Sequence, residues 1–275
     1  MTLTDLWQIE FMRNTLWSAL ILGPACALLG VFVTLRGMAF FSDALAHAAV
    51  TGVALGYLLQ EAAALTAPPL LFVFAFSAVL ATLMAWLFER TRLRPDTVIA
   101  FSFTGSVALG YVIISGLGKH RLIEAVLFGS IYANTPRDLL VQLALALTVS
   151  GVLLWNLKPL ALGILQPDLA RAQGVRLGRQ NYWFALLLAA TVTVCLKMLG
   201  ALLLSALIVV PAAAARLAAG NFKQLLLLAP LIGLCAAVGG ALLSFAADLP
   251  TGPVIVLANA GILLLLFPAR FLRRR

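Results

Sequence analysis

The chain has 275 residues, of which 63% are hydrophobic and 11% charged, and its mean hydropathy is +1.06. A soluble domain carries about 45–50% apolar and about 25% charged residues. This composition excludes an ordinary soluble protein, because so much apolar surface could not be buried in one. The formal net charge is +9. Basic loops that orient a membrane protein explain that excess without nucleic acid as a partner.

Apolar runs of about twenty residues, rich in Ala and Leu, recur along the chain. Their length suits membrane-spanning α-helices, whereas a membrane β-barrel needs alternating segments of about ten residues. The sequence therefore predicts an all-α, polytopic helix bundle that forms one transmembrane domain over residues 1–275. The boundary between the sixth and seventh spans is the least distinct, at Lys197–Gly200. About nine spans are expected, near residues 14–35, 40–60, 68–88, 97–118, 139–157, 182–198, 199–216, 224–246 and 252–268.

Clusters of arginine between these runs indicate how the chain is oriented. Cytoplasmic loops of membrane proteins carry an excess of Lys and Arg. With nine alternating spans, fourteen basic residues fall on one side and five on the other. We therefore expect the N-terminus outside and the C-terminus inside. The three clusters that then lie inside are Arg90 with Arg92 and Arg94, Arg171 with Arg176 and Arg179, and Arg270 with Arg273–Arg275.

One predicted span contains ionisable residues away from its ends. Such residues are costly in a membrane, so each suggests a function. Asp43 and His47 are four residues apart in the second span and share one helix face. A carboxylate oxygen and an imidazole nitrogen suit a divalent first-row metal ion. Two other interpretations stay open: Asp43 orients His47 by accepting its N–H, or the two form a satisfied polar pair between helices.

A polar segment at about residues 166–176 separates the fifth and sixth predicted spans on the inner side. Pro167 suits the first turn of a helix, Asp168 favours a helix N-terminus, and Gly174 suits a helix end. The segment predicts a short cytoplasmic helix, and an ordinary basic loop is the other interpretation.

Sequence motifs of common enzymes are missing from the chain. It contains no G-x-x-x-x-G-K-[ST], H-E-x-x-H or G-x-S-x-G pattern. The chain therefore has no Walker nucleotide site of its own and cannot hydrolyse a nucleotide through one. The three cysteines, Cys26, Cys195 and Cys235, lie inside apolar runs without metal-ligand spacing and are interpreted as packing residues.

Four stretches carry a family pattern between about residues 11 and 265. They are Leu28–Val33 running through Arg36 into Phe41–Ala48; Glu124–Ser130; Asp168–Gly174 followed by Gly200 and Val210–Arg216; and Asp248–Val256. In this order and spacing, they resemble the integral-membrane permeases of ABC importers for zinc, manganese or iron. The family's usual G-D-A-L-S-H motif keeps Asp43 and His47 here, with Ser42 and Ala46 as modest departures.

The resemblance implies a set of partners and a cargo. Two permease copies would pair with two separate cytoplasmic ATP-binding subunits, and an extracytoplasmic metal-binding protein would deliver the ion. The expected location is a bacterial-type inner membrane, in contact with lipid. The cargo would be zinc or manganese, with ferrous iron as a further candidate, and no permanently bound cofactor is expected.

The resemblance also assigns roles to residues. Asp43 and His47 would contact the metal along the translocation path. The segment at about residues 166–176 would be the coupling helix that docks into the ATPase. The coupling residues implied in this way are Pro167, Asp168, Leu169, Ala170, Arg171 and Gly174.

Three further acidic residues, Glu61, Glu124 and Asp248, are candidates for attracting cations or contacting the binding protein. Solvated loop charges are the other interpretation. Three rival functions are weighed against metal import, and one of them, a membrane-embedded enzyme or scaffold, has no visible catalytic constellation. A permease for iron-siderophore or cobalamin would need a wide path without paired metal ligands. An ion-driven secondary cation transporter commonly shows internal repeats, and none is seen in this sequence.

Overall fold

The structure, a computed structural model, describes residues 10–63, 68–91, 93–118 and 135–268. The regular elements in these ranges are all α-helices, as the sequence predicts. In chain order they are α2 (Glu10–Leu35), α3 (Ala39–Ala63), α4 (Pro69–Arg90), α5 (Pro95–Leu117), α7 (Pro136–Trp155), α8 (Leu157–Leu165), α9 (Pro167–Ala172), α10 (Leu177–Ala218), α11 (Phe222–Ala247) and α12 (Thr251–Leu266).

Several helix starts follow from local sequence. The helices α4, α5, α7 and α9 each begin with proline, whose fixed φ suits the first helical turn. Before α7, Thr135 and Asp138 form a capping box in which each side chain accepts from the other's backbone N–H. Before α11, the Asn221 Oδ1 accepts from the backbone N–H of Gln224 at 2.9 Å. These contacts satisfy N–H groups that have no partner inside the helix.

Seven helices in the described ranges are long and apolar enough to cross a membrane. They are α2, α3, α4, α5, α7, the second part of α10, and α11. The apolar helix α12 is shorter, with 16 residues. The count of nine spans therefore stays a prediction, which depends on α12 and on the first part of α10.

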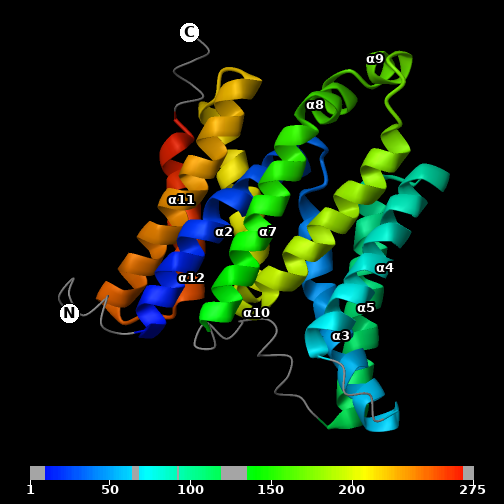
Figure 1. The fold of residues 1–275 in the computed structure, drawn as a ribbon, viewed down its shortest axis with the longest axis vertical. Helices are drawn as coiled ribbons and strands as arrows, with labels where there is room; N and C mark the ends of the chain where they lie inside the picture. The colour runs from blue at the N-terminus through cyan, green and yellow to red at the C-terminus, as the bar shows by residue number, and fades with distance from the viewer. Residues whose placement is uncertain (1–9, 64–67, 92, 119–134, 269–275) are drawn as a thin grey trace.

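Helix α10 consists of two parts that meet at Gly200. This residue has φ 69° and ψ 168°, a region of backbone conformation that is essentially restricted to glycine. The first part leads away from α9, and the yellow ribbon after the break returns toward the end of the molecule where α9 lies (Figure 1). The break thus falls where the sequence predicts the boundary between two spans.

Small residues bring the helices of the bundle into close contact. A Cβ atom on Gly23 of α2 would lie 2.8 Å from the Gly233 carbonyl oxygen of α11. In α3, a Cβ atom on Gly52 would lie 2.7 Å from the Cα of Val73 in α4. Helix backbones approach this closely only where the side chain is absent, as is common inside membranes.

One end of the bundle carries α8 and α9, and we call it the α9 end (Figure 1). Trp155, the last residue of α7, is 90% exposed just before α8. Tryptophan is enriched at membrane–water interfaces, which fits the exit of α7 from a bilayer at this point. Helix α8 lies just beyond the predicted fifth span and was not predicted, because its apolar residues extend that run with only Asn156 and Lys158 as polar interruptions.

Candidate functional site

The candidate site begins at a tight turn between α2 and α3. Gly37 has φ 69°, and the backbone N–H of Met38 donates to the Val33 carbonyl at 3.0 Å. This pattern closes the C-terminus of α2 as a Schellman motif. Helix α3 then starts at Ala39, so Asp43 and His47 lie within its first three turns.

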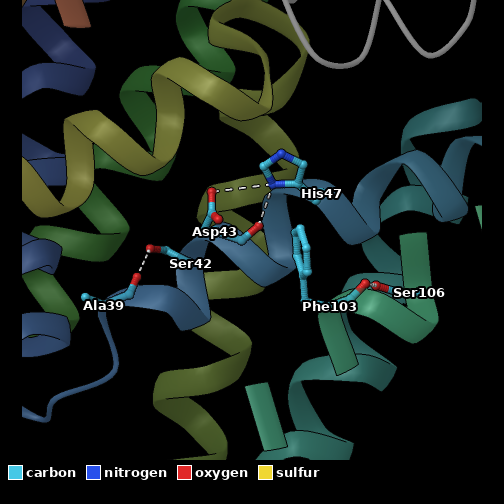
Figure 2. A network of polar contacts seen from close by, with 6 residues as sticks. All are labelled: Ala39, Ser42, Asp43, His47, Phe103 and Ser106. Carbon is cyan, nitrogen blue, oxygen red and sulfur yellow. Dashed lines mark hydrogen bonds and ion pairs between the residues drawn. The ribbon is translucent and has the colours of Figure 1, made fainter. Parts of the chain in front are cut away.

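Figure 2 shows Asp43 and His47 facing each other on α3. The His47 Nδ1 lies 3.0 Å from the backbone carbonyl oxygen of Asp43 and 3.4 Å from its carboxylate Oδ1. A carbonyl oxygen only accepts, so Nδ1 carries the proton in this hydrogen bond. In the neutral imidazole, Nε2 then has the free lone pair that could bind a metal ion.

Two other helices contribute to the surroundings of the pair. The Phe103 ring of α5 packs edge-on against His47, with centroids 5.2 Å apart (Figure 2). Ser205, in the second part of α10, has a side-chain hydrogen bond with Asp43. The side chains of His47 and Asp43 are 18% and 35% exposed. The pair is therefore held by its neighbours and still accessible to a small ion.

A cavity of about 420 Å³ opens beside Asp43. Liquid water occupies about 30 Å³ per molecule, so the cavity has room for a hydrated ion. Asp96, in the first turn of α5, brings a second carboxylate to the cavity wall. Sequence reasoning missed Asp96, because an acid at a helix start is expected for helix stability alone. The lining residues are Phe40, Asp43, Asp96, Ile99, Ala100 and Phe103.

The number of metal-binding side chains around the pair is small. In the described ranges, no three or more His, Cys, Asp or Glu residues gather to hold a metal ion. A closed structural zinc site typically has four protein ligands. Asp43 and His47 provide at most two protein ligands.

The segment predicted as a coupling helix contains α9. Gly174 has φ 76°, and the backbone N–H of Val175 donates to the Ala170 carbonyl at 2.9 Å, closing the helix end. Asp168 and Arg171 form an exposed ion pair at 3.1 Å. Leu169 is exposed and Ala170 is buried. Proline at the start and glycine at the end thus produce the short helix that the sequence predicts.

The other candidate acids do not gather at the pair. Glu61 is exposed near the end of α3, about 27 Å along the helix axis from Asp43 by its rise per residue. Asp248 caps the C-terminus of α11 with φ 54°, and it is also exposed. Glu124 lies outside the described residues. Glu61 and Asp248 thus do not gather with Asp43 and His47.

A bundle of membrane-length apolar helices, with an ionisable pair beside a cavity that has room for a hydrated ion, is typical of a multi-pass membrane transport protein. Residues 8–269 match the ABC 3 transport family, and the chain belongs to this family. It is thus a transport subunit of an ABC transporter, in which a separate ATPase subunit hydrolyses ATP.

Alignments with similar proteins extend over nearly the whole chain. It is 29% identical over 266 residues to the manganese transport system membrane protein MntC of Halalkalibacterium halodurans, covering 96% of this chain and 88% of that protein. It is 30% identical over 259 residues to the high-affinity zinc uptake system membrane protein ZnuB of Haemophilus influenzae, covering 94% and 97%. The structure of PsaBC from Streptococcus pneumoniae in complex with Fab superposes with a TM-score of 0.83 at 25% identity, covering 98% and 96%.

Proposed function

We propose that this chain is the membrane permease of an ATP-driven importer that carries a divalent transition metal ion into the cytoplasm. Manganese and zinc are the first candidates, because relatives of similar length are named for these two ions. Ferrous iron is a third candidate, because the same ligand types bind it. The observation that carries the proposal is the Asp43–His47 pair, which lies on one face of α3 beside the cavity.

Along the proposed path, Asp43 and His47 temporarily replace part of the ion's hydration shell. The Nε2 of His47 binds the ion directly, and Asp43 either orients the ring through Nδ1 or turns to bind the ion itself. The proposed second permease copy faces the first and supplies a second pair. Binding through a few ligands stays weak enough for the ion to leave again, as transport requires.

The proposed orientation places the α9 end in the cytoplasm and the N-terminus outside. Four exposed arginines support this orientation, because they lie at the end of α4, in α9 and at the start of α10. They are Arg90, Arg171, Arg176 and Arg179. Positive charge of this kind favours the cytoplasmic side of a bacterial inner membrane. The nine-span count then requires that both parts of α10 and the short α12 each cross the bilayer.

The proposed partners follow from this orientation. The exposed helix α9 docks into one of two cytoplasmic ATP-binding subunits through Pro167–Arg171, with Gly174 ending the helix. An extracytoplasmic metal-binding protein delivers the ion at the opposite end, where Glu61 and Asp248 are candidates for contact. ATP binding moves α9, and the rigid helices transmit the movement to the path.

Transport by the assembled complex tests this function. The permease is expressed with its ATPase, reconstituted into lipid vesicles, and supplied with its binding protein and radioactive manganese or zinc. We expect accumulation of the ion that depends on ATP. A complex that hydrolyses ATP but accumulates none of manganese, zinc or ferrous iron would contradict the proposal.

A further inference from the structure

A half-buried contact at the α9 end joins the turn before α3 to the start of α10. Arg36 lies in this turn, and its Nη1 donates to the Asn181 Oδ1 at 2.8 Å. The guanidinium carbon lies 4.4 Å from the ring centroid of Phe184, in cation–π geometry. Arg36 and its two partners in α10 are 145 and 148 positions apart in the chain. The turn between α2 and α3 is therefore attached to the first turns of α10.

Helix α4 joins the same cluster through its last turn. The Asn181 Nδ2 donates to the Glu89 Oε1 at 3.4 Å. Gly178 of α10 makes room for this carboxylate, because a Cβ atom there would lie 2.9 Å from the same oxygen. The rings of Phe41 and Phe88 lie 6.0 Å apart and connect α4 to α3. The ends of three helices are thus in contact around Arg36.

The charge of Arg36 makes this contact hard to break. Burial lowers the pKa of Arg36 to about 10, so the guanidinium is still protonated at neutral pH. Its Nε is buried without a hydrogen-bond partner. A buried charge that loses its partners is strongly destabilising. When the start of α10 moves, Arg36 therefore has to move with it or lose both Asn181 and Phe184.

The cluster lies between the two segments that the proposed function has to connect. On one side, four residues separate the end of α9 at Ala172 from the start of α10 at Leu177. On the other side, Asp43 follows Arg36 by seven residues, across a turn that the Schellman motif holds rigid. Movement of α9 can therefore reach Asp43 and His47 through a short series of packed contacts.

We propose that Arg36 is a positioning residue that transmits movement of α9 and the start of α10 to α3, and so to Asp43 and His47. This role rests on the proposed function. Transmission needs elements with two discrete packed arrangements rather than continuous deformation. Arg36 holds α10 by a charged hydrogen bond and a cation–π contact, so the turn before α3 would follow the start of α10 from one arrangement to the other.

The test compares metal transported per ATP hydrolysed in reconstituted vesicles. Arg36→Gln removes the positive charge, whereas Arg36→Lys keeps the charge but lacks the planar guanidinium group. Asn181→Ala removes the hydrogen-bond acceptor of Arg36. Arg216→Gln, at an exposed arginine in the last turn of α10, is the matched control. Thermal unfolding and recovery of the ATPase with the permease show whether each variant folds and assembles.

We expect Arg36→Gln to lower the amount of metal transported per ATP hydrolysed on the order of tenfold. This factor corresponds to the free energy of one hydrogen bond to a charged group. Arg36→Lys should recover part of the loss, and the double variant with Asn181→Ala should be no worse than the more severe single variant. Arg216→Gln should keep the ratio.

A wild-type ratio in folded Arg36→Gln, or fully additive losses in the double variant, would overturn the transmitting role while leaving metal import intact. If Arg36→Gln fails to fold, a wild-type ratio in Asn181→Ala overturns it instead. A wild-type complex that transports no metal fails the proposed function itself, and the transmitting role with it.

Discussion

His47 donates its Nδ1 hydrogen to the carbonyl oxygen of Asp43, one turn earlier in α3, at 3.0 Å. The Asp43 carboxylate approaches the same nitrogen, at 3.4 Å. Figure 2 shows the second ring nitrogen on the other side of the imidazole, away from Asp43. In this conformation Asp43 therefore sets the direction of the ring, and Nε2 is the atom left to bind an ion.

This geometry predicts graded effects at the pair. We expect His47→Ala to reduce the initial rate of metal uptake by about tenfold or more, because it removes the ligand atom. Asp43→Ala should also be severe, whereas Asp43→Asn should keep part of the uptake, because an amide oxygen still accepts from Nδ1. Uptake is measured in cells without other importers, with Leu58→Ala at an exposed position of α3 as control. Normal uptake by His47→Ala at normal expression would rule out the site.

The end of α9 gives a second prediction. Gly174 has φ 76°, where a side chain costs about 1–2 kcal/mol. Gly174→Ala should weaken the helix end and so reduce metal-stimulated ATP hydrolysis in the assembled complex. Gly151→Ala is the control, since a methyl group there meets no atom within 4 Å. Equal stimulation in the two variants would count against docking through this segment.

Contact between α2 and α10 gives a third prediction. A Cβ atom on Gly30 would collide with the backbone carbonyl of Ile208. Gly30→Ala should therefore force the helices apart and destabilise the protein by about 1–3 kcal/mol. Gly105→Ala in α5 meets no atom within 4 Å and should be neutral or stabilise by about 0.5–1 kcal/mol. Thermal unfolding in detergent compares them; a Gly30→Ala protein as stable as the wild type would disprove this close packing.

Asp248 gives a fourth prediction, which separates a structural from a docking role. Its φ of 54° and ψ of 43° place it in the left-handed region, where glycine has no steric penalty. Asp248→Gly should therefore keep or raise stability, and Asp248→Ala should lower it by about 1 kcal/mol. A stable Asp248→Gly protein that transports normally with the binding protein would remove Asp248 from the candidates for contact. A stable Asp248→Gly protein with reduced uptake would show instead that the carboxylate contacts a partner.

Local features of the chain were predictable because neighbouring residues encode them. Long apolar runs require helices in a bilayer, since backbone groups there must be satisfied internally. Pro167 and Gly174 delimit α9, and the break at Gly200 falls at the predicted boundary between spans. The spacing of Asp43 and His47 places them on one helix face, and the structure brings them into contact. Helix α8 escaped prediction because only Asn156 and Lys158 interrupt an apolar run that otherwise continues from α7.

By itself, the sequence determined that this is a helical membrane protein, roughly where its long apolar helices lie, and which ionisable pair one helix presents. Only the tertiary structure decided what surrounds that pair: Phe103 and Ser205 from other helices, and Asp96 in the wall of the same cavity. It also decided that Arg36 meets Asn181 at the start of α10. Such contacts join residues far apart in the chain, and they depend on how the helices pack rather than on local sequence.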